Sequence, residues 1–232
     1  MKKLLFWIVL IVGTVVLLGS CAKKDDSTTA TAAGDVAGTG TTASGTITGN
    51  ENLTGTFHMS WYGQEPSGGC VDNSSAISDF SFPSETLSFK REFIITGTST
   101  FTQSQITYSD ATCSTMTSYF NVMYKNVTIG SELTGLTAGS SPAKPTTANK
   151  ISYTSKSYSL MANTTASIAK HLSAYEQTMT SGEEMNIDES SPATEYNLIA
   201  TGTVSGSTYL FLGRGSSADN KTDWGSSSTY WK

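Results

Sequence analysis

The chain has 232 residues, with 14 Lys and Arg against 19 Asp and Glu, and a formal net charge of −5. A negative charge argues against nucleic acid as a partner and against electrostatic attraction to anionic lipid. Only 14% of the residues are charged, whereas Ser, Thr, Gly and the strand-forming Val, Ile, Tyr and Phe are plentiful. This composition is typical of a mainly β protein.

The first 20 residues have the pattern of an export signal. Two lysines precede an uncharged run from Leu4 to Leu18, and the small residues Gly19 and Ser20 stand directly before Cys21. The run is shorter than the roughly 20 apolar residues that span a bilayer. We therefore expect a cleaved signal peptide over residues 1–20.

The sequence Leu18-Gly19-Ser20-Cys21 resembles the lipobox of bacterial lipoproteins. The resemblance implies that the Cys21 thiol receives a diacylglyceride and that the new amino terminus is acylated. Two or three acyl chains hold a protein stably on a membrane, whereas one chain binds marginally. Because Ala22 and not Asp follows the cysteine, the resemblance implies an outer-membrane location, with the periplasmic and surface-exposed faces both open. The alternative is an uncleaved signal anchor with an incidental cysteine.

Residues 21–50 separate this signal from the rest of the chain. They are mostly Ala, Thr, Gly and Ser and contain no aromatic residue, so they are expected to form a flexible tether, on the order of 30 Å long. Residues 51–232 are expected to form one domain, long enough to bury an adequate core. Removing residues 1–20 removes two lysines and no acidic residue, which changes the net charge from −5 to −7.

The chain contains three cysteines, Cys21, Cys70 and Cys113. If Cys21 carries lipid, the other two remain as a pair in an oxidising compartment, where disulfides form. A Cys70–Cys113 disulfide would close a loop of about 43 residues and stabilise the fold by roughly 3–4 kcal/mol. Two free buried thiols are the alternative. With the distant His58 and His171 these cysteines match no zinc pattern, so no metal site is predicted.

A period-2 pattern of side chains begins soon after the tether. Large apolar residues, Phe57 among them, alternate with polar residues over 53–62, which predicts a half-buried strand. His58 falls on the polar face, where a solvated histidine is favoured over a catalytic one. The stretch 64–83 is rich in Gly, Ser, Asn and Asp, and we expect a long loop that contains Cys70.

The next predicted strand, 87–96, places an arginine among aromatic residues. Phe89, Arg91 and Phe93 share one face because they are two residues apart. A buried arginine must be paired or hydrogen-bonded. Arg91 is interpreted either as a charge in a ligand cavity or, with more weight, as a strand-end residue paired with a local acid.

The remaining strands are predicted from apolar and β-branched runs between turn signals. They are 101–108, 116–129, 151–160, 195–204 and 208–213, the last two joined as a hairpin by the turn 205–207. The stretch 135–149 is expected to be a loop. The aromatic residues of the tail, 220–232, suggest that it returns to the body of the domain.

Apolar residues at spacings of three and four predict one helix, over 164–179, with Thr164 or Thr165 as its N-cap. The helix is expected to pack on the β structure or to cap one end of it. The loop 181–192 is acidic, but its spacing matches no calcium loop. A solvated charge cluster is therefore favoured over a cation site.

Sequence motifs for enzymatic chemistry are absent. The chain has no Gly-x-Ser-x-Gly, no His-Glu-x-x-His, no Cys-x-x-Cys and no phosphate-binding glycine loop. No nucleophile and base can be paired from the sequence, so we predict neither an enzyme nor a cofactor.

The order of the parts resembles lipocalin-like domains. Gly55-x-Phe57 is similar to the Gly-x-Trp opening of lipocalins, and Tyr108-x-Asp110-x-x-Cys113 is similar to a segment of the lipocalin-like domain in the adenomatosis-polyposis-coli-down-regulated family. The resemblance implies an antiparallel up-and-down β-barrel of roughly eight strands with one helix. It also implies that an arginine near the last strand, here Arg214, packs over the opening aromatic residue.

Two functions are consistent with these features. In the first, the membrane-anchored barrel binds a small apolar ligand, and its lining includes Phe57, Phe89, Arg91 and Phe93. In the second, the barrel is filled by side chains, and loops such as 64–83 engage surface partners in the envelope or on a host.

Overall fold

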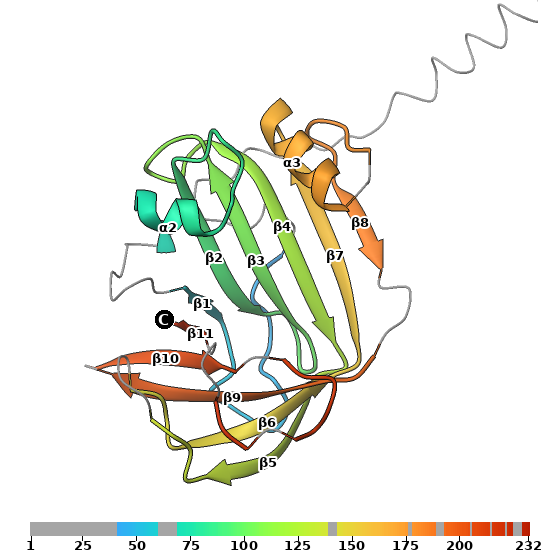
Figure 1. The fold of residues 1–232 in the computed structure, drawn as a ribbon. Coiled ribbons are helices and arrows are strands. Elements are labelled where there is room, and N and C mark those ends of the chain that lie inside the picture. The colour runs from blue at the N-terminus through green and yellow to red at the C-terminus, as the bar shows by residue number, and fades with distance from the viewer. Residues whose placement is uncertain are drawn as a thin grey trace, which may run out of the picture. The chain divides into compact units, whose positions relative to one another are not determined.

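The computed structural model describes residues 41–59, 69–138, 143–175, 178–188, 193–204, 206–213, 215–220, 222–224 and 229–232 (Figure 1). The lipobox with Cys21 and the residue Arg214 lie outside these ranges. Within them, no helix is both long and apolar enough to cross a membrane.

The described elements are mainly strands. The strands are β1 (Thr56–His58), β2 (Ser88–Ile95), β3 (Phe101–Tyr108), β4 (Met116–Lys125), β5 (Thr128–Thr134), β6 (Thr147–Tyr153), β7 (Ser155–Ala162), β8 (Met185–Asp188), β9 (Glu195–Val204), β10 (Ser207–Leu212) and β11 (Thr229–Trp231). The helices are α2 (Ser74–Asp79) and α3 (Thr165–Tyr175).

The strands form two antiparallel sheets (Figure 1). The first has the order β1-β2-β3-β4-β7-β8, and the second has the order β11-β10-β9-β6-β5. The prediction of a mainly β, antiparallel fold is confirmed. The predicted closed barrel is not observed as a single sheet: the described strands form two sheets, because the chain bends from one sheet into the other.

Two of the predicted strands are each divided at such a bend. The strand predicted over 116–129 is two strands, β4 and β5, separated by Asn126, whose φ is 54°. The strand predicted over 151–160 is likewise divided between β6 and β7 at Thr154. The Asn126 side-chain amide donates to the Thr154 hydroxyl at 2.8 Å, which joins the two bends. Neither bend carries the Gly or Pro that would indicate it in the sequence.

The main core lies between the two sheets. It combines apolar residues of the first sheet, such as Phe93, with apolar residues of the second, such as Ile199 and Leu210. Its middle is a run of stacked or edge-on rings with centroids 4.5, 4.5 and 4.6 Å apart. In order, the rings belong to Phe93, Phe101, Tyr124 and Tyr153. These rings fill the centre of the space between the sheets.

The two sheets also meet at one edge, beside β1 and β11. Met59 and Trp231 form an isolated antiparallel bridge. The backbone N–H of Lys232 donates to the carbonyl of His58 at 2.7 Å, and the reciprocal bond is 2.5 Å long. Trp231 is 1% exposed. The tail predicted to return to the domain therefore does so by pairing.

Several other described segments differ from the sequence predictions, and residues 147–149 of the predicted loop 135–149 belong to β6. Residues 41–50, the last part of the expected tether, lie on the domain: Ile47 is buried in the main core and the Ser44 N–H donates to the Ile95 carbonyl at 2.8 Å. A second helix, α2, lies in the loop predicted over 64–83, because Asn73 caps it. Residues 185–188 of the predicted acidic loop form β8, which pairs with β7.

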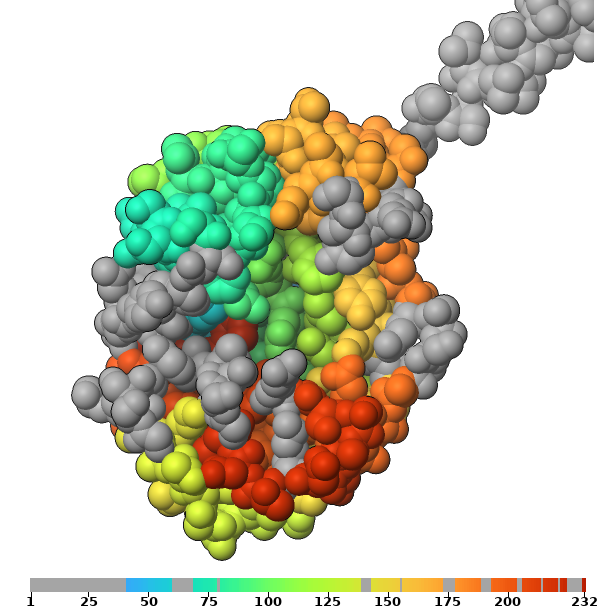
Figure 2. Space-filling view, in the orientation of Figure 1, coloured from blue at the N-terminus to red at the C-terminus, as the bar shows by residue number. Residues whose placement is uncertain are grey.

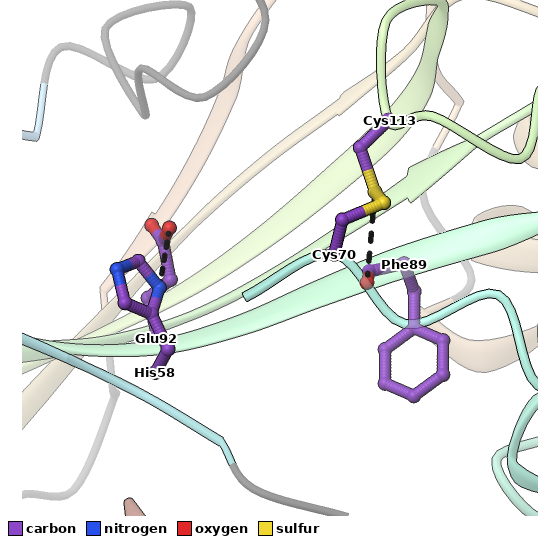
Figure 3. Close-up of polar contacts among 5 residues, drawn as sticks. All are labelled: His58, Cys70, Phe89, Glu92 and Cys113. Atoms are coloured by element: carbon purple, nitrogen blue, oxygen red, sulfur yellow. Dashed lines mark hydrogen bonds and ion pairs between the residues drawn. A yellow bond between two sulfur atoms is a disulfide. The ribbon is translucent and has the colours of Figure 1, made fainter. Parts of the chain in front are cut away.

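The turn between β3 and β4 holds the disulfide. Cys113 is bonded to Cys70, with their Cα atoms 5.9 Å apart, as predicted. The Cys113 Sγ lies 3.8 Å from the carbonyl oxygen of Phe89 on β2 (Figure 3). Cys113 has a φ of 55°, which costs backbone energy for a non-glycine residue. The disulfide therefore fastens the 69–73 segment to the first sheet.

The carboxylate of Asp110 organises this turn. It accepts hydrogen bonds from the backbone N–H groups of Thr112 at 2.8 Å and Ser114 at 3.1 Å, and from the Thr112 hydroxyl at 2.7 Å. The hydrogen bond from the Thr112 side chain, together with those from the backbone, lowers the pKa of Asp110 well below its ordinary value of 3.8. The charged carboxylate thus belongs to the folded turn.

We expect the stability supplied by Asp110 to depend on pH. Because folding lowers its pKa, the contribution is complete above about pH 5 and is lost as the pH falls below the ordinary value towards the lower folded value. Asp110→Asn should therefore be less stable than the wild-type chain at pH 7, and this difference should shrink between about pH 4 and pH 2. Thermal denaturation at these pH values measures it. Asp72→Asn, at an exposed site, is the control, and an equal effect there would contradict the role of Asp110.

Candidate functional site

A pocket with a volume of about 110 Å³ opens on the inner face of the first sheet. Figure 2 shows the hollow between the segment that follows α2, the helix α3 and the strands β3 and β4 at its floor. Its lining residues are Phe80, Ser81, Phe82, Pro83, Gln105, Thr107, Ser118, Phe120, Lys170 and His171.

One wall is the short segment after α2. The Asn73 side chain accepts hydrogen bonds from the first backbone N–H groups of α2, which begins the helix there. Beyond the helix, the rings of Phe80 and Phe82 stack with centroids 5.4 Å apart. Phe82 also packs on the buried Phe89 of β2, at 4.8 Å. The wall is therefore aromatic and is anchored in the core.

The floor of the pocket comes from β3 and β4. Gln105 faces Phe120 across the strands, and Thr107 faces Ser118. The hydroxyls of Thr107 and Ser118 are 2.8 Å apart and hydrogen-bond to each other. The side-chain amide of Gln105 makes no hydrogen bond within the described part of the chain, so this amide remains available to a ligand.

The rim comes from α3, whose position is set by its first turn. The Thr164 hydroxyl accepts from the Ser167 N–H at 3.1 Å, as the predicted N-cap does, and the Ser167 hydroxyl donates to the Thr117 carbonyl of β4 at 3.0 Å. This places Lys170 and His171 over the pocket. Burial, and then the charge of Lys170, lowers the pKa of His171. The rim is basic, and none of the described lining residues is acidic.

Arg91 lies beside the pocket on the same face of the sheet. It is half-buried and is the direct cross-strand partner of Gln105. Its guanidinium lies over the rings of Phe80, at 5.0 Å, and Trp231, at 5.6 Å, and its Nη1 is 3.4 Å from the Met59 sulfur. Burial lowers its pKa, an effect that the Tyr124 hydroxyl opposes. Among the described residues, no carboxylate is in salt-bridge contact with Arg91.

A second cation on the inner face is paired. The Lys156 ammonium is bonded to the Glu195 carboxylate, which also accepts from the Tyr153 hydroxyl at 2.8 Å. It lies 5.7 Å from the centre of the Tyr124 ring. Both cations rest on aromatic rings, and only Lys156 has a counter-ion within the described residues. Lys156 thus forms a structural ion pair, whereas Arg91 forms none among the described residues.

None of the four residues predicted to line a ligand cavity is among the described lining residues of the pocket. Phe57, Phe89 and Phe93 are at most 7% exposed and lie in the main core. Arg91 contacts Phe80, which the core and the pocket share. Gln105 and Phe120 were not among the predicted lining residues, although each lies four positions from a residue of the main core on its own strand, Phe101 and Tyr124, which places both on the inner face.

His58 lies on the opposite, outer face of the first sheet. Its Nδ1 is 3.3 Å from the Oε1 of Glu92, and Figure 3 shows the ring and the carboxylate facing each other. Glu92 is 1% exposed, and its Oε2 has no hydrogen-bond partner in the described part of the structure. The half-buried His58 is thus part of a packed pair, where the sequence analysis favoured a solvated side chain.

Gly69 closes over this histidine, and we expect its replacement to be costly. Its φ is +71°, and a Cβ there would lie 2.6 Å from the His58 Nδ1. Gly69→Ala should lower the free energy of unfolding by about 1–3 kcal/mol, measured by urea denaturation. Gly206→Ala is the matched control, because Gly206 has a φ of +82° and no atom within 4 Å of its Cβ position. Equal losses in both variants would mean that the His58 contact contributes nothing.

Two comparisons with known proteins were negative. No family model matches the chain, and no curated protein matches it. The candidate function is therefore argued from the site itself.

Proposed function

We propose that this chain is a bacterial outer-membrane lipoprotein, anchored through acyl chains on Cys21, whose lipocalin-like domain binds a small apolar ligand. Binding, and not catalysis, is the proposed activity. The observation that carries the ligand part is the aromatic-walled pocket between α3 and the inner face of β3 and β4.

The order of strand pairing supports a lipocalin-like fold. If the consecutive pairs β4 with β5, β6 with β7, and β8 with β9 are each counted as one place in the order, every strand pairs with its neighbours in sequence. The circuit then has eight strands, and the Met59–Trp231 bridge joins the last strand to the first. Eight strands in this order are those of an up-and-down barrel. The filled centre and the pocket at one end would then be two parts of one interior.

The residues around Cys21 support the lipid anchor, and a single substitution of this cysteine tests it. Cys21→Ala should abolish lipid attachment, because acylation requires the thiol, and should leave the signal peptide uncleaved or the product soluble. Gel mobility and membrane fractionation of the producing cells measure both effects. Cys70→Ala is the control for loss of a thiol. Unchanged size and unchanged membrane retention of Cys21→Ala would contradict the proposal.

The size of the pocket limits what it holds. An apolar cavity of roughly 150 Å³ takes a benzene molecule, and drug-sized ligands occupy roughly 300–1,000 Å³. A pocket of about 110 Å³ therefore has room for only a few non-hydrogen atoms, which would be one end of a larger ligand. The rest of the ligand would lie in the hollow that opens from the pocket (Figure 2).

Retention of a ligand by the purified chain tests the proposal. The full chain is purified in phosphatidylcholine vesicles, extracted with organic solvent and analysed by mass spectrometry. Gln105→Trp fills the pocket and should reduce the retained species at least tenfold, whereas Ser131→Trp, at an exposed position of β5, should retain it. Identical extracts from wild-type and Gln105→Trp chains would contradict ligand binding in this pocket.

One observation favours the second candidate, a surface-interaction lipoprotein. The aromatic rings at the centre of the interior leave little space there. Leu87 and Leu172 are 55% and 45% exposed, so their apolar side chains are accessible to a partner. A chain that retains no small molecule but is cross-linked to an envelope protein through residues near Leu87 would support this candidate.

A further inference from the structure

The inner face of the first sheet carries Arg91, a cation that has no anion beside it among the described residues. Arg91 is half-buried, and within the described residues its guanidinium contacts two aromatic rings and a thioether but no carboxylate. Removing a charge from water is costly unless it is paired. Cation–π contacts recover only part of that cost. Within the described part of the chain, the charge of Arg91 is therefore not balanced by an anion.

The position of Arg91 connects it to the pocket. Gln105 lines the pocket and is the direct cross-strand partner of Arg91, so their Cβ atoms are about 5 Å apart. Phe80 lines the pocket, and the guanidinium of Arg91 lies over its ring. A group that enters the pocket as far as Gln105 comes within reach of the arginine.

Other polar residues that line the pocket also carry hydrogen-bond donors. The side-chain amide of Gln105 is free of hydrogen bonds in the described part of the chain, and the rim contributes Lys170 and His171. The walls are the aromatic rings of Phe82 and Phe120. A guanidinium with a neighbouring amide donor fits the two oxygens of a carboxylate. The aromatic walls fit a hydrocarbon chain.

We propose that the ligand is a monocarboxylate with an apolar tail, and that Arg91 and Gln105 hold its carboxylate at the inner end of the pocket. This inference rests on the proposed ligand-binding function and names its chemical class. Arg91 lies beside the inner end of the pocket and Lys170 lies at its rim, so a ligand with one anionic group at its inner end suits this arrangement. The carboxylate supplies the counter-ion that Lys156 already has in Glu195.

The test compares two ligands that differ only in the charge of the head group. The full chain, in phosphatidylcholine vesicles, is equilibrated by dialysis with radiolabelled octanoate or with octanamide, and protein-free vesicles correct for partition into lipid. The wild-type chain should bind octanoate at least tenfold more tightly than octanamide. This preference is measured without any substitution.

Two variants assign the preference to Arg91. Arg91→Gln should weaken octanoate binding about tenfold and change octanamide binding by less than twofold. Lys90→Gln is the matched control, because Lys90 precedes Arg91 on β2, points to the other face and is 5% exposed. It removes the same charge from the same strand and should leave both affinities unchanged. Circular dichroism confirms that each variant is folded.

The outcomes separate the two proposals. Equal binding of octanoate and octanamide by the wild-type chain would overturn the carboxylate inference and leave the apolar-ligand function standing. A wild-type preference that persists in Arg91→Gln would also overturn the inference, because the carboxylate would then be held elsewhere. Binding of neither ligand would overturn the inference and the proposed function together.

Discussion

Replacing Trp231 by Ala should lower the free energy of unfolding by about 3–5 kcal/mol, the usual cost of removing a buried Trp side chain. The indole is 1% exposed and packs 6.0 Å from the Phe93 ring. Its backbone forms the bridge to Met59 that joins the two sheets. The substitution therefore leaves a cavity at the point where the sheets meet. Urea denaturation followed by circular dichroism measures the loss.

The same variant also reports on the surroundings of Arg91. Because Trp231 covers one side of the guanidinium at 5.6 Å, its loss should expose the cation to water as well as weaken the core. Leu87→Ala is the control for loss of a large side chain, since Leu87 is 55% exposed, and it should cost less than about 0.5 kcal/mol. A cost below about 1 kcal/mol for Trp231→Ala would show that the junction contributes little to stability.

Removal of the disulfide should also lower the free energy of unfolding by a large amount. The bond between Cys70 and Cys113 spans 43 positions of the sequence. In the chain-entropy model a loop of that length contributes roughly 3–4 kcal/mol, because the bond restricts the unfolded chain. The double variant Cys70→Ser/Cys113→Ser should lose this amount in urea denaturation.

Reduction supplies an independent measurement of the same bond. The wild-type chain in excess dithiothreitol should unfold close to the urea midpoint of the double variant, whereas the double variant should not respond to dithiothreitol. The Cys113 side chain is 1% exposed, so reduction is expected to be slow unless the chain opens. A wild-type midpoint that does not change after complete reduction, verified by thiol alkylation, would contradict a stabilising role.

The pocket explains why most of the site was not predictable from the sequence. Its wall comes from residues 80–83, its floor from β3 and β4 and its rim from α3. Each segment is short and without a motif. Alternation along a strand places Gln105 on the inner face, but the helix that faces it is 65 positions further along the chain. Only the three-dimensional packing brings these segments together.

Arg91 was predictable in part, because the sequence indicates the face of the sheet it occupies but not the residues it contacts. Its spacing from Phe89 and Phe93 predicts that it points to the core side of the sheet, and it does so. Whether an arginine there is paired with an acid is decided by the opposite layer, which belongs to distant parts of the sequence. An arginine paired with a local acid was the favoured expectation. Among the described residues, the guanidinium contacts Phe80, Trp231 and Met59.

The strand and helix content follows largely from local patterns. The strands near 88–95 and 101–108, the hairpin of β9 and β10, and helix α3 all lie where side-chain periodicity predicts them, because that periodicity is a property of each segment alone. The cysteine pair could be predicted because only two partners remained. The bends at Asn126 and Thr154, and with them the division into two sheets, depend on which face of each strand finds apolar partners. That choice is made by packing between segments far apart in the sequence, and so it belongs to the tertiary structure.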